Sequence, residues 1–195
     1  MADENVAAPN GLTPAYHLTG GEIRNNLRGR YSIPTTYGTA IYNGDPVTEV
    51  GTTNLGGTIE INRAATAGIV CGVFRGCRYT GTDGVLRYSD HWVASTALKS
   101  GTVCEAIVCD DPQVVFEAQS DGTFAVTAIG DLIDYTVSDG NAATGKSNAS
   151  MDTSTSGGTG TAWQIMGMVD RPGNEIGDYT WIHVWPKLHA LRPLA

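Results

Sequence analysis

Four acidic side chains that stand close together in the sequence could do chemistry as a group. They lie within residues 110–122, which read Asp-Asp-Pro-Gln-Val-Val-Phe-Glu-Ala-Gln-Ser-Asp-Gly, and they are Asp110, Asp111, Glu117 and Asp121. Carboxylate oxygens are the ligands that Ca²⁺ prefers, so one hypothesis is a calcium site, although the Asp-x-Asp-x-Asp spacing of an EF-hand loop is absent. Glu117 and Asp121 could instead be the paired carboxylates of a glycosidase. An acidic interaction surface is a third hypothesis. Plain turn chemistry is the favoured one, because Asp-Asp-Pro and Ser-Asp-Gly are good turn sequences.

A second group with chemical potential is aromatic and lies near the end of the sequence. Trp181, His183 and Trp185 alternate with Ile182 and Val184, which in a strand places the three ring-bearing side chains on one face. Aromatic platforms stack on sugar rings, and aromatic residues are also enriched at protein interfaces. Three interpretations therefore stay open for these side chains: packing in the core, an oligomer or partner interface, and a ligand site.

The four cysteines do not follow a known metal or redox motif. Cys71, Cys77, Cys104 and Cys109 are spaced C-x5-C and C-x4-C, which fits neither zinc pairs nor a C-x-x-C centre. In a protein made in the cytosol the default is a reduced thiol that packs as a small apolar side chain. We expect free thiols, with disulfides as the alternative.

Several catalytic signatures are missing from the sequence. It contains no G-x-S-x-G elbow, no phosphate-binding loop, no H-E-x-x-H pair and no dinucleotide fingerprint. We therefore expect a protein that is not an enzyme and that uses no cofactor and no metal.

The elements that carry these groups are predicted from the composition. The chain has 195 residues, of which 41% are hydrophobic, with 25 Gly and 23 Thr. Glycine suits tight turns and threonine suits a pleated, half-buried surface. This predicts an all-β fold, a compact β-barrel or β-sandwich.

Charge and hydropathy argue against two kinds of partner. The formal net charge of −8 disfavours sequence-independent binding to nucleic acid, which needs clustered Lys and Arg. No run approaches the ~20 apolar residues that span a membrane, and the polar start lacks the basic and apolar regions of a signal peptide. We expect no nucleic-acid partner and no membrane partner.

The first 38 residues look different from the rest of the sequence. Pro and Gly punctuate residues 1–38, which predicts an extended N-terminal arm, followed by a single β-rich domain over residues 39–195. Basic and apolar side chains cluster at the end of this arm, and we expect them to dock on acidic and apolar groups of a partner. They are Arg24, Arg28, Arg30, Tyr31 and Ile33.

Within residues 39–195 the strands are separated by recognisable turns. Asn43-Gly44 and Asp83-Gly84 predict tight turns between strands. Residues 103–109 are apolar on both faces except for Glu105, which predicts a central strand covered on both sides. Residues 114–128 predict a hairpin around Asp121-Gly122. The Ser/Thr/Gly-rich segment 138–162 predicts either a mobile loop or an edge segment laid over the sheet.

Short motifs in order along the chain resemble head structural proteins of tailed bacteriophages, in particular the capsid decoration or cement type. They are residues 111–122 of the acidic stretch, Gly-Leu-Thr-Pro at 11–14 with His-Leu-Thr-Gly-Gly at 17–21, Ile-Tyr-Asn-Gly-Asp-Pro-Val at 41–47 with Gly-Val-Phe at 72–74, and Ile-Met-Gly-Met-Val at 165–169 with Arg-Pro-Gly-Asn at 171–174. The resemblance covers most of residues 11–185. The cysteines are not part of it.

The resemblance implies a β-rich protein of the virion, made in the cytoplasm of the bacterial host and bound to the major capsid protein on the outer head surface. It implies no enzyme activity. Binding the assembled shell stabilises it by linkage, and a homo-oligomer, a dimer or trimer, would add avidity. Trp181, His183 and Trp185 are the expected oligomer interface. The alternative function is a tail-associated or carbohydrate-binding receptor module that uses the same three side chains.

Overall fold

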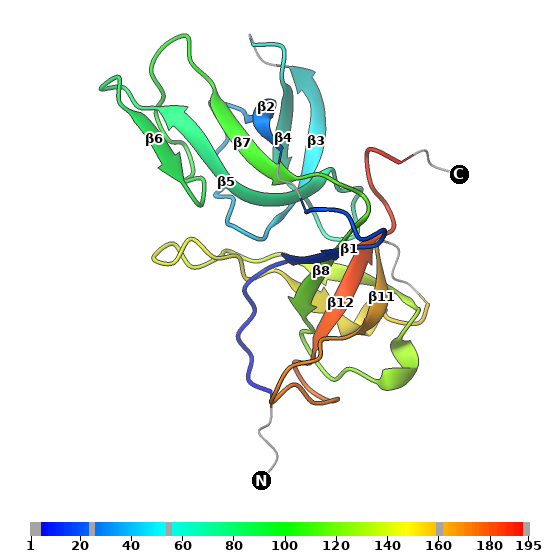
Figure 1. The fold of residues 1–195 in the computed structure, drawn as a ribbon. Coiled ribbons are helices and arrows are strands. Elements are labelled where there is room, and N and C mark those ends of the chain that lie inside the picture. Colours follow the sequence, from blue (N-terminus) through cyan, green and yellow to red (C-terminus); the bar gives the residue numbers. More distant parts are fainter. Residues whose placement is uncertain (1–4, 24–25, 54–55, 159–161, 193–195) are drawn as a thin grey trace.

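The computed structural model describes residues 5–23, 26–53, 56–158 and 162–192. The fold is all-β, as predicted, and two sheets pack against each other (Figure 1). The helical segments in these ranges are the short 3₁₀ turns η1 (Val126–Ala128) and η2 (Thr153–Thr155). Neither is long enough to reach across a membrane.

The upper sheet of Figure 1 closes into a small barrel. Its strands are β2 (Asn26–Ile33), β3 (Pro46–Thr53), β4 (Ile59–Arg63), β5 (Gly72–Thr80), β6 (Leu86–Ser89) and β7 (Cys104–Cys109). Their order is β3-β4-β2-β7-β5-β6, and a further pairing of β3 with β5 joins five of them into a ring. The pairing of β2 with β4 is parallel and the other pairings in this sheet are antiparallel. β6 lies outside the ring, at the edge.

The lower sheet has the order β1-β8-β12-β11-β9-β10. Its strands are β1 (Thr13–His17), β8 (Val114–Gln119), β9 (Leu132–Thr136), β10 (Ser150–Asp152), β11 (Trp163–Met168) and β12 (Trp181–Pro186). A parallel bridge between Ser120 and Met151 brings the end of β8 next to β10, so this sheet also curls on itself.

Each sheet encloses its own apolar core. In the lower core Trp163 packs edge-on against Phe116 and Tyr135, with ring centroids 5.6 and 6.4 Å apart. The upper core is built around Trp92, and the lower core also receives side chains from the upper sheet, such as Val73. The two sheets are therefore joined by apolar packing.

Strand β7 has the central place that its sequence predicts. It lies between β2 and β5, with Cys104, Ala106 and Val108 in the upper core and Cys109 in the lower core. The face with Cys104, Ala106 and Val108 is fully covered, whereas on the other face Glu105 and Ile107 are half-buried, so the expected coverage on both sides is found only in part.

Residues 1–38 differ from the expected arm. Within the described part of this segment, β1 pairs with β8 in the lower sheet, and β2 pairs with β4 and β7 in the upper one. Tyr31 and Ile33 alternate with Ser32 along β2, and both point into the upper core. This alternation of apolar side chains incorporates the segment into the barrel.

Two other segments also settle into definite structure. In the segment 138–162 the edge alternative is the one observed: β10 pairs with β9, and Ala149 and Met151 are buried in the lower core. The predicted hairpin around Asp121-Gly122 is wrong. β8 pairs with β1 and β12 instead, and residues 126–128 form the turn η1.

Candidate functional site

The first two acids of the 110–122 stretch hold the connection between the sheets. Asp111 Oδ2 lies 3.1 Å from Nε2 of His17 on β1, and Asp111 Oδ1 accepts a hydrogen bond from the backbone N–H of Gln113 at 2.8 Å. Asp110 lies 3.9 Å from the guanidinium of Arg30 on β2. These contacts agree with the turn interpretation, because the carboxylates fix the link from β7 to β8.

The other two acids of the stretch point elsewhere. Glu117 Oε1 lies 3.6 Å from Nε2 of His183 on the outer face of the lower sheet. Asp121 Oδ1 accepts hydrogen bonds from the backbone N–H and the hydroxyl of Thr153, at 2.9 and 3.1 Å. Among the described residues, no three His, Cys, Asp or Glu side chains gather as they would around a metal ion.

The aromatic group near the end of the chain does form one surface. On β12, Ile182 and Val184 are fully buried in the lower core, so Trp181, His183 and Trp185 point to the opposite, outer face. Glu117 of β8 lies directly across from His183. The predicted alternation of faces is therefore confirmed.

Two arginines cover the tryptophan rings on this outer face. The guanidinium carbon of Arg171 lies 4.2 Å from the ring centroid of Trp181, and that of Arg192 lies 3.9 Å from Trp185. The carbonyl of Pro112 accepts hydrogen bonds from Trp185 Nε1 at 3.0 Å and from Arg192 Nη2 at 2.9 Å. The shared carbonyl fixes Arg192 on the Trp185 ring. The Trp181 side chain, under Arg171, is 9% exposed.

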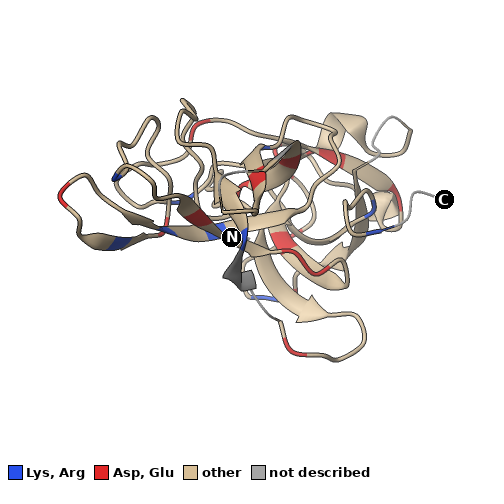
Figure 2. Cartoon of the chain, turned by 90° about the horizontal axis from the view of Figure 1, so that it is seen from above, with Lys and Arg blue, Asp and Glu red and all other residues tan. Residues whose placement is uncertain are grey.

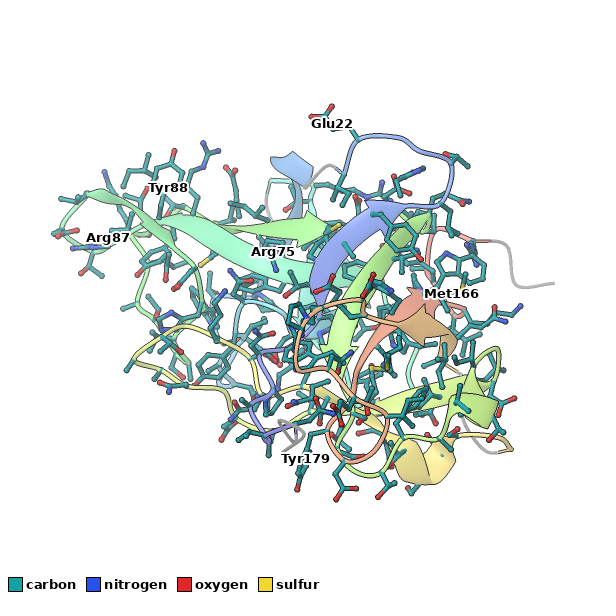
Figure 3. All side chains as sticks on the ribbon, turned by 60° about the horizontal axis from the view of Figure 1, so that its bottom comes forward. Glu22, Arg75, Arg87, Tyr88, Met166 and Tyr179 are labelled. Carbon is teal, nitrogen blue, oxygen red and sulfur yellow. The ribbon has the colours of Figure 1, made fainter. Side chains whose placement is uncertain are left out.

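The neighbouring strands extend this surface with further exposed apolar groups. Tyr16 of β1, 41% exposed, contacts the His183 ring edge-on at 5.2 Å. Met166, 39% exposed, occupies an irregularity in β11 between Ile165 and Gly167 (Figure 3). We call this surface the Trp–Arg face. It consists of Tyr16, Met166, Arg171, Trp181, His183, Trp185 and Arg192.

The sequence reasoning found only the three β12 members of the Trp–Arg face. Arg171 comes from the turn after β11 and Arg192 from beyond β12, so their stacking on tryptophans depends on tertiary packing. The Arg-Pro-Gly-Asn turn at 171–174 was the signal that could have placed Arg171 at the end of the sheet.

Of the five residues expected to dock a partner from the N-terminal segment, the structure describes the side chains of three, Arg30, Tyr31 and Ile33. Arg24 lies outside the described residues, and only the backbone of Arg28 is described, in β2. Arg30 has the carboxylate partner given above and lies 5.3 Å over the ring of Tyr31. Tyr31 and Ile33 are 0% and 1% exposed, so in this fold their side chains face the protein's own core and cannot act as anchors.

The four cysteines are free and buried in the structure. Burial raises the pKa of the Cys71 thiol, and it raises the pKa of Cys109 to about 12. A thiol with a raised pKa is a poor nucleophile at neutral pH. These side chains serve the cores as small apolar groups.

Comparisons of the chain with profiles of known protein families, with curated protein sequences and with solved structures give no match.

A buried carboxyl group links the two halves of the molecule. Asp45 is fully buried. One of its oxygens accepts a hydrogen bond from the backbone N–H of Tyr42 at 2.8 Å, and the other accepts one from the hydroxyl of Ser147. Desolvation raises the pKa of Asp45 from 3.8 to about 6, and the two hydrogen bonds oppose this shift.

The substitution Asp45→Asn should become more favourable as the pH rises. Because the folded-state pKa is the higher one, the stabilisation from the neutral carboxyl is complete below pH 3.8 and is lost as the pH rises through about 6. Between about pH 4.5 and about pH 7.5 the difference in unfolding free energy should move about 2 kcal/mol in favour of the variant. Urea denaturation at both pH values measures it. Ser147→Ala keeps the carboxyl and removes a hydrogen bond that opposes the raised pKa, so it should keep or enlarge the pH dependence. A difference between Asp45→Asn and the parent protein that stays constant with pH would contradict the argument.

Proposed function

We propose that this protein is a non-enzymatic structural component of a bacteriophage virion, a decoration or cement protein. It binds the major capsid protein on the outer surface of the head and stabilises the DNA-filled shell. The observation that carries the binding role is the Trp–Arg face. The resemblance of the sequence motifs to decoration proteins is the reason for naming the major capsid protein as the partner.

The Trp–Arg face has the composition of a protein interface. Aromatic residues, Met and Arg are enriched at interfaces between proteins, and Trp, Tyr and Arg supply most of the residues with large binding energies. The face lies on a sheet, which holds its side chains in fixed places and lowers the entropy lost on binding.

Its charge also suits a protein partner. Within the described residues, neither Arg171 nor Arg192 has a carboxylate at ion-pair distance. The chain as a whole has a net charge of −8, and on this face each guanidinium is a separate cationic site, with Glu117 beside His183 between them. Such a site favours acidic groups on the partner and steers the encounter with them.

The same geometry disfavours the carbohydrate-binding alternative. A sugar ring stacks on an open aromatic face, and here a guanidinium occupies one face of Trp181 and one face of Trp185. A tail-associated role stays as an outcome of the test below.

The test is the copy number of the protein on phage heads. The double variant Met166→Glu with Arg171→Glu removes exposed groups of the face without touching the lower core. We expect it to lower head occupancy at least about tenfold, which corresponds to about 1.4 kcal/mol of binding free energy. Quantitative mass spectrometry of purified heads, with the protein supplied at a limiting concentration, measures this occupancy.

Lys146→Glu is the matched control, because it makes the same charge change as Arg171→Glu at an exposed position outside the Trp–Arg face. It should leave the occupancy unchanged. The proposal fails if the protein is found on tails, if it is missing from heads, or if the double variant binds normally. A double variant that changes the mass in solution but not the occupancy would assign the face to a dimer or trimer instead.

A further inference from the structure

The edge strand β6 has backbone groups that are free to pair with another strand. The backbone N–H of Gly81 donates to the carbonyl of Val85 at 3.0 Å, next to the pair formed by Thr80 and Leu86. Hydrogen-bonded and non-hydrogen-bonded pairs alternate along an antiparallel ladder. The N–H and C=O groups of Leu86 and Tyr88 therefore point away from β5. Within the described residues, no other strand pairs with β6.

Two of the four side chains along this edge, Leu86 and Tyr88, are large and exposed. Leu86 is 53% exposed and Tyr88 is 68% exposed. They lie on the same face of the sheet, opposite Thr80 and Arg78 of β5. Figure 3 shows Tyr88 and Arg87 on the hairpin that projects from the upper sheet. Native edge strands are ordinarily protected by charged residues or by covering segments. β6 carries one charged residue, Arg87, and its neighbours Leu86 and Tyr88 are not covered by another segment within the described residues.

A pocket opens on the same face beside the edge. Its volume is about 920 Å³, and its wall includes Leu86, Leu98, Lys99 and the ion pair of Arg78 with Glu105. This volume lies within the ~300–1,000 Å³ of ordinary ligand pockets. A strand added beside β6 would place alternate side chains over this face, within reach of the pocket rim.

Acidic and basic groups are mixed near the edge, where Figure 2 shows both kinds on the hairpin that carries β6. The pocket wall holds Arg78 and Lys99 together with Glu60 and Glu105, and Arg78 is paired with Glu105. Arg87 is paired with Asp83. The ammonium of Lys99 lies 4.0 Å from where a Cβ on Gly84 would stand, just before β6, and it has no carboxylate partner within the described residues. A carboxylate on an added strand would complement it.

We propose that β6 binds an extended polypeptide segment that carries carboxylates, by adding it as a strand to the edge of the upper sheet. Backbone hydrogen bonds to Leu86 and Tyr88 hold the segment. Its apolar side chains lie against these two residues, and an acidic side chain meets Lys99. This is recognition by strand addition, and it is independent of the Trp–Arg face.

A second copy of the protein fits this edge less well. In a two-fold antiparallel pairing that uses the outward groups of Leu86 and Tyr88 in both copies, Arg87 stands directly opposite its own equivalent. Like charges in that position are destabilising. An acidic segment meets no such repulsion.

The experiment uses the purified full chain and short synthetic peptides. One peptide alternates Val with Glu and another alternates Val with Lys. Two further peptides have the acidic sequence with backbone amide nitrogens methylated, one peptide along one edge of the strand and the other along the opposite edge. NMR is expected to show that the Val/Glu peptide slows hydrogen exchange at the amides of Leu86 and Tyr88. Methylation of the pairing edge, or replacement of Glu by Lys, should weaken binding at least tenfold.

Two variants test the contributions of the backbone and the charge. Tyr88→Pro removes an outward N–H and should weaken binding more than Tyr88→Ala, which keeps the N–H and loses only the ring. Lys99→Glu should abolish the preference for the acidic peptide. The inference is overturned if the peptides leave both amides unprotected, if the methylated or basic peptides bind equally well, or if the amides become protected with protein concentration alone. Because these peptide experiments require no virion, failure here leaves the head-binding proposal standing, and the reverse also holds.

Discussion

Replacement of Trp163 by Ala is expected to lower the free energy of unfolding by about 3–5 kcal/mol, the usual cost of truncating a buried Trp. Its side chain is fully buried and packs edge-on against Phe116 and Tyr135. Truncation removes both aromatic contacts and leaves a cavity where β8, β9 and β11 meet. Urea denaturation followed by circular dichroism measures the loss.

Two further variants make this result specific. The indole N–H of Trp163 is buried without a hydrogen-bond partner in the described structure, so Trp163→Phe keeps an aromatic ring, removes this unpaired donor and should cost much less than the Ala substitution. Trp92→Ala is the equivalent truncation in the upper core, where the Trp92 ring contacts Tyr79 edge-on with ring centroids 6.0 Å apart. A loss below about 1 kcal/mol for Trp163→Ala, the average for any substitution, would contradict the packing seen here.

Gly72→Ala is expected to destabilise the protein by about 3 kcal/mol or more, because backbone strain and overpacking each cost about 1–3 kcal/mol. Gly72 begins β5 with φ of +152°, a conformation that other residues rarely adopt. A Cβ there would overlap the carbonyl oxygen of Cys109 and would also lie 2.7 Å from a methyl group of Val108. The obstacle is mainly backbone, so it cannot move aside cheaply.

The chain offers a control that separates the strain from the clash. Gly167 in β11 has nearly the same φ, +156°, and a Cβ there would meet no atom within 4 Å. Gly167→Ala should therefore show the conformational cost alone. Equal losses in the two variants would mean that the close approach of β5 to β7 does not matter for stability.

The parts of the fold that could be predicted are those with local signals. The Asp83-Gly84 turn predicts that the strands on either side of it pair, and β5 and β6 do form a hairpin. The alternation of Trp181 to Trp185 lies within one strand and predicts which of its side chains face the core. Strand β2 was missed because Gly29 and the arginines around it hide the apolar alternation of Tyr31 and Ile33. Its partners β4 and β7 are distant in sequence.

The candidate site was predictable only in part for the same reason. Nothing local connects Arg192 with Trp185, or Arg171 with Trp181, because each pair forms only when the segments beyond the strands fold back onto β12. The acidic stretch was conspicuous in the sequence, yet Asp110 and Asp111 serve the connection between the sheets. Closely spaced aspartates in a turn sequence therefore predict a turn better than they predict a ligand site.

The path of the chain has a consequence for biosynthesis. The upper sheet uses strands between residues 26 and 109, whereas the lower sheet takes β1 from before that stretch and β8 to β12 from after it. Domains fold as units while the ribosome is still working, so the upper sheet can close first. The lower sheet must wait for β12, which fits between β8 and β11. Until β12 emerges, the facing edges of β8 and β11 have no partner strand. A nascent chain stalled before residue 181 would therefore carry a folded upper sheet and a lower sheet with two edges open to aggregation.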